Sequence, residues 1–85
     1  MTQYTIKHLL STEKAVRMMQ QENKLTFIVD EKATKQEVKK AIEEKFKVKI
    51  VAVNTLNTPD GRKKAYITLA PEHQALDIAT QLGAI

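Results

Sequence analysis

The stretch VNTLNTPDGRKKAYITLA, residues 53–70, decides how this chain is expected to fold, because a strong turn signal separates two strand-like segments. In the turn Thr58-Pro59-Asp60-Gly61, proline presets its own dihedral angle and glycine accepts a positive φ. The preceding VKIVAVNTL (48–56) is rich in β-branched residues, and KAYITLA (64–70) follows the turn. The pattern predicts a β-hairpin whose first strand is buried on both faces for part of its length. Three consecutive cations, Arg62-Lys63-Lys64, stand at the root of its second strand.

Alternation and helical spacing predict the elements on either side of this hairpin. KLTFIVD (24–30) alternates with period two, which places Leu25, Phe27 and Val29 on one side of a strand. Thr34 with Glu37 three residues later forms a capping box ahead of a helix. The helix after Thr34 carries an apolar stripe of Val38, Ala41, Ile42 and Phe46. Before it, we predict a short strand over 4–9 and a helix that is capped by Ser11 or Thr12 and has Ala15, Val16 and Met19 on one face. A last helix is predicted to open with Pro71-Glu72-His73, to turn Leu76, Ala79 and Leu82 inward, and to have Gly83 as its C-cap.

The predicted order is strand, helix, strand, helix, strand, strand, helix. Long crossovers and one hairpin favour an α+β fold with a four-stranded, mainly antiparallel sheet and helices packed on it. The chain has 85 residues, so we expect a single domain over 1–85. The order of the strands in the sheet does not follow from the pattern.

The composition disfavours an enzyme. The chain has no cysteine, and His8 and His73 have no ligand-type companion at metal-binding spacing, so we predict no metal and no cofactor. Two glycines cannot form a phosphate-binding loop, and adjacent Glu43 and Glu44 point about 100° apart on a helix, which leaves no catalytic residue to name. No apolar run approaches the roughly 20 residues of a membrane helix. We therefore expect a soluble, cytoplasmic protein that does not bind a membrane.

The positive charge is concentrated in the middle of the chain. Residues 1–31 carry four cations and four anions, residues 32–64 carry ten cations and four anions, and residues 65–85 carry two anions. This asymmetry indicates a polyanionic partner, with nucleic acid first in line. The alternative is a lysine-rich solvated surface without a specific partner.

Candidate RNA contacts cluster on the hairpin. Cations and short polar side chains on a rigid scaffold are the usual phosphate contacts, although lysines also protect an edge strand from aggregation. The predicted contacts are Asn54, Thr55, Arg62, Lys63, Lys64 and Tyr66 on the hairpin, Lys35 and Lys39 on the helix after Thr34, and Lys7, Thr12 and Lys14 near the N-terminus. Only Tyr66 is a candidate for an exposed ring, because Phe27 and Phe46 belong to apolar patterns. We expect a protein that binds folded RNA through shape and phosphates.

Several segments together resemble the ribosomal large-subunit protein family numbered twenty-three, which sits at the exit of the polypeptide tunnel. The segments are KKAYITLA with Ile78 eight residues after Ala70, LLSTEKA near the N-terminus, and NKLTFIVDEKATKQEVKKAIEEKFKVKIVAVNTL in the centre. LLSTEKA is similar to the family's Pro-x-(Ser/Thr)-Glu-Lys motif, with leucine where a proline is often found. The resemblance implies a three-layer α/β/α sandwich with a four-stranded antiparallel sheet.

The resemblance also implies partners. Family members bind large-subunit rRNA, adjoin other ribosomal proteins, and offer a docking surface to the signal recognition particle or other nascent-chain factors. By this resemblance Lys63 and Lys64, with Asn54 and Thr55, lie against rRNA phosphates, and Glu13 in the Ser/Thr-Glu-Lys motif is the factor-docking residue. The hairpin loop from Asn57 to Lys63 is short, as in archaeal and eukaryotic members, and reaches only about 10 Å, so no tunnel-lining role is assigned. Two other classes remain open: a stand-alone protein-interaction module with a basic hairpin, and a single-strand RNA binder.

Overall fold

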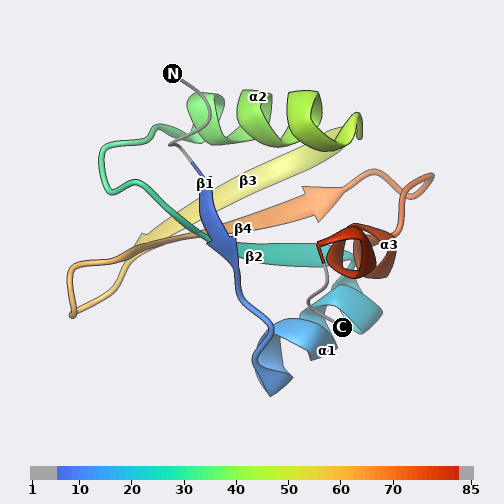
Figure 1. The fold of residues 1–85 in the computed structure, drawn as a ribbon, viewed down its shortest axis with the longest axis horizontal. Coiled ribbons are helices and arrows are strands. Elements are labelled where there is room, and N and C mark those ends of the chain that lie inside the picture. Colours follow the sequence, from blue (N-terminus) through green and yellow to red (C-terminus); the bar gives the residue numbers. More distant parts are fainter. Residues whose placement is uncertain (1–5, 83–85) are drawn as a thin grey trace.

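The computed structural model of the chain describes residues 6–82. Its elements, in chain order, are β1 (Ile6–Leu9), α1 (Glu13–Glu22), β2 (Lys24–Val29), α2 (Lys35–Phe46), β3 (Ile50–Asn57), β4 (Lys63–Leu69) and α3 (Ala75–Gln81). Within the described residues the strands form one sheet in the order β1-β2-β4-β3, with every neighbouring pair antiparallel (Figure 1). The α+β class and the four-stranded antiparallel sheet are thereby confirmed.

Both predicted threonine caps are present. Thr12 precedes α1, and its hydroxyl oxygen accepts a hydrogen bond from the backbone N–H of Ala15 at 3.2 Å. Thr34 precedes α2 and exchanges hydrogen bonds with Glu37 in both directions, at 2.9 and 3.1 Å, which is a complete capping box. These local bonds satisfy N–H groups that a helix start leaves without an intrahelical partner.

One face of the sheet carries the core. The predicted alternation of β2 is confirmed, because the register pairs Leu25 with Ile67 and Phe27 with Ala65. Helices α2 and α3 bring apolar side chains onto the same face. The buried cluster includes Leu25, Phe27, Val29, Val38, Ile42, Ala65, Ile67, Leu69, Ile78 and Ala79. Burial of this apolar surface is the main source of stability for a chain of this size.

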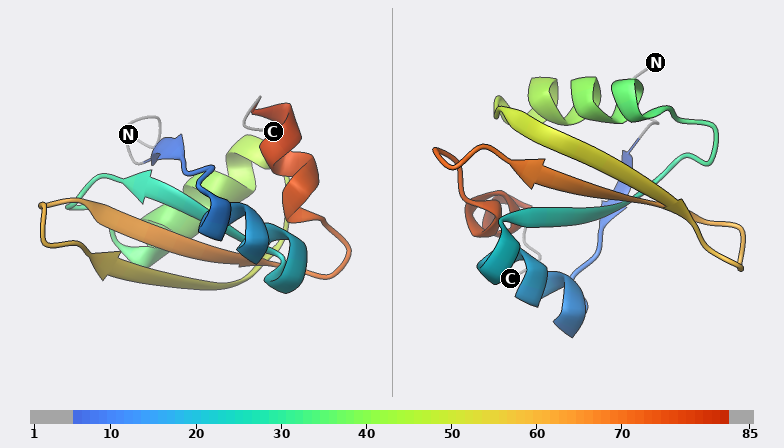
Figure 2. Two further views of the ribbon diagram at one scale, coloured as in Figure 1. Left: turned by 90° about the horizontal axis from the view of Figure 1, so that it is seen from below. Right: turned by 180° about the vertical axis from the view of Figure 1, so that it is seen from behind.

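Among residues 6–82, no helix lies on the opposite face of β3 and β4. The right-hand view of Figure 2 shows both strands unobstructed from behind. Helix α1 packs against β2 and contributes Met19 to the core cluster, and Thr26 and Ile28 of β2 are buried although they point away from that cluster. We call the side of β3 and β4 that points away from α2 the open face.

Asn23 joins α1 to the segment between β4 and α3. It adopts the left-handed conformation with φ 56°, which ends α1. Its side-chain Nδ2 donates to the carbonyl oxygen of His73 at 2.8 Å, and its Oδ1 accepts from the backbone N–H of Ala75 at 2.8 Å. One polar side chain therefore holds the start of α3 in place.

Two predictions about burial were wrong. The strand in 48–56 is not buried on both faces: β3 is an edge strand in which only Ile50 is buried and Val51 is 63% exposed. The last helix begins at Ala75 instead of Pro71, and its buried residues are Ala75, Ile78 and Ala79. Leu82, predicted inward, is 39% exposed: it is the C-cap residue that follows α3, whose last residue is Gln81. The predicted strand residues 4 and 5 and the predicted C-cap Gly83 lie outside the described residues.

Candidate RNA-binding surface

The open face is built by the β3–β4 hairpin. Directly paired residues of an antiparallel sheet point to the same side, and successive residues of a strand alternate between sides. Asn54 pairs with Tyr66, and Leu56 pairs with Lys64, so these four side chains share the open face. Tyr66 also pairs with Thr26 on β2, which places the tyrosine in the middle of a row that crosses three strands.

The two adjacent lysines of the hairpin lie on opposite sides of the sheet. Lys63 points to the side of α2, where its Nζ donates a hydrogen bond of 2.6 Å to the carbonyl oxygen of Ala33, just before α2 begins. Lys64 points to the open face and belongs to none of the ion pairs found within residues 6–82. Thr55 shares the side of Lys63, because it pairs with Ala65. The structure therefore separates Asn54 and Lys64 from Thr55 and Lys63.

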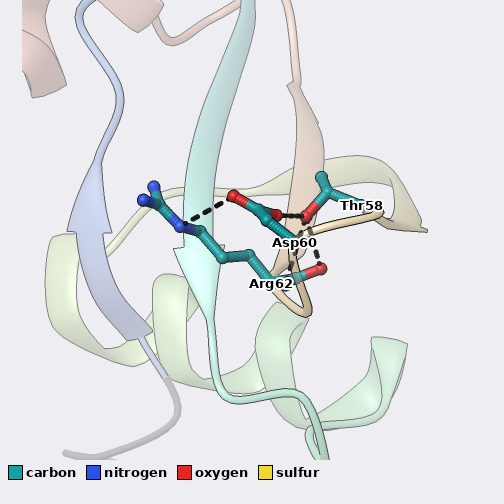
Figure 3. A network of polar contacts seen from close by, with 3 residues as sticks. All are labelled: Thr58, Asp60 and Arg62. Carbon is teal, nitrogen blue, oxygen red and sulfur yellow. Dashed lines mark hydrogen bonds and ion pairs between the residues drawn. The ribbon is translucent and has the colours of Figure 1, made fainter.

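The turn between β3 and β4 is held by a local polar network, drawn in Figure 3. The hydroxyl of Thr58 hydrogen-bonds to the Asp60 carboxylate and accepts from the backbone N–H of Arg62 at 3.1 Å. The Nε of Arg62 lies 3.3 Å from Oδ2 of Asp60. The Thr58 hydroxyl, and after it the backbone and charge of Arg62, lower the pKa of the Asp60 carboxyl. Gly61, at φ 86°, supplies the positive φ that the turn requires.

A shallow groove continues the open face toward this turn. The residues that line it are Leu10, Thr12, Ile28, Thr58, Pro59, Asp60, Arg62 and Lys64. Because Asp60 already pairs with Arg62, part of the guanidinium charge is offset within the protein. Lys64 is the cation of this groove that carries no such partner among the described residues.

The predicted contact residues fall into two groups. Those gathered on the open face and its groove are Thr12, Asn54, Arg62, Lys64 and Tyr66. Those placed elsewhere are Lys7 at an irregularity of β1, Lys14 on α1, Lys35 and Lys39 on the exposed side of α2, and Thr55 and Lys63 on the α2 side of the sheet. The structure thus brings five of the eleven predicted contacts together.

The sequence reasoning missed two members of the open face. Leu56 is 53% exposed, and Thr68 lies two residues beyond Tyr66 on the same side. Both follow from period-two alternation once Asn54 and Tyr66 are assigned to one face. The prediction of a strand buried on both faces for part of 48–56 hid this signal at Leu56.

Comparison with known proteins places this chain in a family. The family model described as "Ribosomal protein L23" matches residues 4–77. This chain belongs to the ribosomal protein L23 family. It is 48% identical over 80 residues to the large ribosomal subunit protein uL23 of Pyrobaculum aerophilum, covering 94% of this chain and 99% of that protein. It is 50% identical over 80 residues to the protein of the same name from Trypanosoma brucei brucei, covering 94% of this chain but only 49% of that longer protein.

Membership of the L23 family confirms the resemblance drawn from the sequence motifs. It also confirms the prediction of a ribosomal protein that is not an enzyme. Residues 6–82 contain no group of three or more histidine, cysteine or carboxylate side chains that could hold a metal ion, and none of their helices is both long and apolar enough to cross a membrane.

The Ser-Thr-Glu-Lys motif lies at the start of α1, and its Thr12 lines the groove that the hairpin turn also lines. Glu13 is the first residue of the helix, where the dipole favours an anion. Its side chain is 92% exposed, and its carboxylate lies 3.6 Å from Nη2 of Arg17 one turn later. Glu13 is thus accessible to a partner, although an exposed ion pair of this kind contributes little to stability.

Proposed function

We propose that this protein is a structural constituent of the large ribosomal subunit that binds large-subunit rRNA near the polypeptide exit and works as one rRNA-binding domain over residues 1–85. Family membership supports the ribosomal role. The open face supports the binding mode, because it brings Asn54, Lys64 and Tyr66 together on a rigid sheet that no helix covers. This arrangement is the observation that carries the proposal.

We assign the two groups of candidate contacts different parts in binding. Thr12, Asn54, Arg62, Lys64 and Tyr66 form the principal rRNA surface. Exposed lysines on other elements (Lys7, Lys14, Lys35 and Lys39) contact more distant phosphates or neighbouring ribosomal proteins. Thr55 and Lys63 were predicted as phosphate contacts, but the bond from Lys63 to Ala33 supports a structural part for that lysine.

The layering implied by the family resemblance belongs to the same proposal. Burial of Thr26 and Ile28 next to α1 supports a helical layer on the second side of β2. Helices α2 and α3 supply the layer on the first side. In this three-layer α/β/α arrangement the second helical layer is partial, since β3 and β4 are bare there (Figure 2). The gap in that layer is where rRNA would lie.

The rRNA proposal is tested by cofractionation. The full chain, expressed in cells with a tag, should sediment with the large ribosomal subunit in sucrose gradients at high salt, in the cytoplasmic fraction. A free interaction module or an independent single-strand RNA binder would stay at the top of such a gradient. Recovery of the protein only in light fractions would refute the ribosomal role.

We further propose that Glu13 contributes to docking of the signal recognition particle or another nascent-chain factor. Its exposure on a projecting first turn suits an electrostatic encounter with a basic partner. Glu13→Gln removes the charge, and Arg17→Met is the matched control, because it breaks the same ion pair but leaves Glu13 ionised. Factor affinity of reconstituted subunits should fall by about 1 kcal/mol or more for Glu13→Gln only. Equal factor affinity in both variants would show that Glu13 is only an anion at the end of the helix and does not dock the factor.

A further inference from the structure

The middle of the open face presents one aromatic ring between small polar neighbours. Tyr66 is half-buried, with Thr26 beside it on β2 and Asn54 beside it on β3. Directly opposed residues have Cβ atoms about 5 Å apart, and diagonal neighbours remain within reach of an aromatic side chain. Leu56 is such a diagonal neighbour and is 53% exposed. Tyr66 and Leu56 together form an apolar platform bordered by an amide and an ammonium group.

The charge of this face suits an anion. The outward positions of β2, β3 and β4 are Lys24, Thr26, Ile28, Ala52, Asn54, Leu56, Lys64, Tyr66 and Thr68. None of these residues is acidic, and two are lysines, of which Lys24 is paired with Glu22 at 3.2 Å. A phosphate beside Lys64 would therefore meet no carboxylate from the sheet itself.

The size of the face suits a nucleotide better than a protein. The bare part spans two strands about 5 Å apart and roughly five residues of about 3.3 Å each, so it is about 10 Å wide and 17 Å long. A stable protein–protein interface needs about 800 Å² from each partner, several times this area. One or two bases fit within it, and aromatic side chains are the usual platforms for bases that are not paired.

We propose that the open face binds an unpaired RNA nucleotide whose base stacks on the ring of Tyr66. The Asn54 side chain, which offers both a donor and an acceptor, lies beside the ring and hydrogen-bonds the edge of the base. Lys64 lies two residues along β4, about 7 Å away, where its ammonium group meets the adjoining phosphate. This inference rests on the proposed rRNA-binding function and departs from the expectation that the protein binds only shape and phosphates.

The chain itself supplies the probe for a test. It contains no tryptophan and only two tyrosines, Tyr4 and Tyr66, so the variant Tyr4→Phe leaves Tyr66 as the sole tyrosine emitter. Stacking of a base on a tyrosine ring quenches its emission. Titration with oligoadenylate should quench Tyr66, whereas the same bases locked in a poly(A)·poly(U) duplex should bind with much less quenching. Oligoadenylate that binds without quenching would refute the stacking.

Three variants separate stacking from charge. Tyr66→Phe keeps the ring and should retain oligoadenylate affinity, whereas Tyr66→Leu keeps bulk without a π-face and should weaken it roughly 5-fold or more. Lys64→Met should weaken binding of both single-stranded and duplex RNA. Melting curves of Tyr66→Leu show whether it is folded, and if it is not, Tyr66→Phe and the quenching of Tyr66 still decide the question.

The outcomes distinguish base stacking on Tyr66 from the proposed rRNA-binding function on which it rests. If both RNAs bind through Lys64 while Tyr66→Leu has unchanged affinity and Tyr66 is not quenched, stacking is refuted and phosphate binding stands. If neither RNA binds and the chain also fails to sediment with the large subunit, the proposed rRNA-binding function is refuted as well. Binding of an acidic polypeptide at this face in competition with RNA, with Tyr66 unquenched by oligoadenylate, would assign the face to a protein partner.

Discussion

Replacing the two hairpin lysines one at a time should produce two different defects. The change is Lys63→Met and, separately, Lys64→Met, because methionine keeps most of the aliphatic stem and removes the charge. Lys63 donates a 2.6 Å hydrogen bond to the Ala33 carbonyl and is half-buried, whereas Lys64 faces the opposite side of the sheet. We expect Lys63→Met to reduce stability and Lys64→Met to reduce RNA binding.

The magnitudes follow from these contacts. A hydrogen bond to a charged group contributes about 1.5–3 kcal/mol when well shielded, and partial exposure of Lys63 reduces this to about 1 kcal/mol. For a domain of this size that corresponds to a fall in melting temperature of roughly 4–8 °C. Lys64→Met should change stability by less than about 0.5 kcal/mol. It should instead lower the slope of log affinity against log salt by about 0.7–0.9, the value for one lost phosphate contact.

Circular dichroism during thermal denaturation measures the change in stability. Salt titration of binding to large-subunit rRNA measures the loss of a phosphate contact. Lys35→Met, on the exposed side of α2, is the control for removing any one lysine. The double replacement of Lys63 and Lys64 should lower the salt slope by about one unit, because only Lys64 is expected to contact a phosphate. The reasoning is refuted if Lys63→Met lowers the salt slope as much as Lys64→Met and leaves the melting temperature unchanged.

Three further changes test how the scaffold is held. Asn23→Ala should lower the free energy of unfolding, measured in urea, by about 2–3 kcal/mol. Asn23→Gly should lower it by about 1 kcal/mol less than Asn23→Ala, because glycine suits φ 56°. Equal losses in the two variants would show that the left-handed backbone conformation at residue 23 does not destabilise the alanine variant. Thr26→Val should raise the urea midpoint by the equivalent of about 1 kcal/mol, because the buried Thr26 hydroxyl has no partner within the described residues, and a lower midpoint would reveal one. Thr58→Val should raise the pKa of Asp60 toward its ordinary value in a carboxyl titration followed by NMR. Since the folded-state pKa of Asp60 is lowered, stabilisation by its ionised carboxylate is present above the unfolded-state pKa and is lost as pH falls through the folded-state pKa. The stability of the Thr58→Val variant should therefore be less sensitive to acid in this range. An unmoved pKa of Asp60 would exclude the Thr58 hydroxyl as the main cause of the shift.

Much of the local structure could be predicted because its causes lie within a few residues. The caps at Thr12 and Thr34 need only a threonine and the N–H groups of the following turn. The alternation of β2 needs only the period of an extended backbone, and the turn at Gly61 needs only a residue that accepts positive φ. The family motifs were equally local, which is why the resemblance could be drawn from short segments.

The failed predictions concern burial, which depends on residues far along the chain. β-branched residues from 48 to 56 are compatible with a central strand or an edge strand, and the pairing of β4 with β2 is what leaves β3 at the edge. Likewise, Leu82 continues the apolar face of Ile78 and Ala79, but α3 ends at Gln81, so Leu82 follows the helix and stays 39% exposed. Neither the pairing of the strands nor the end of the helix is visible in a short window of sequence.

The sequence alone determined the element types, the turn, the excess of cations in the middle of the chain and the family. Period-two alternation even required Lys63 and Lys64 to point in opposite directions. Only the tertiary structure decided which direction is free. Helix α2 packs on the side of Lys63, which bonds to the carbonyl of Ala33 just before that helix, while no helix of the described part of the chain covers the side of Lys64 and Tyr66. The physical reason is that a strand presents two equivalent faces until long-range packing buries one of them, and the face left bare is the one that we propose binds RNA.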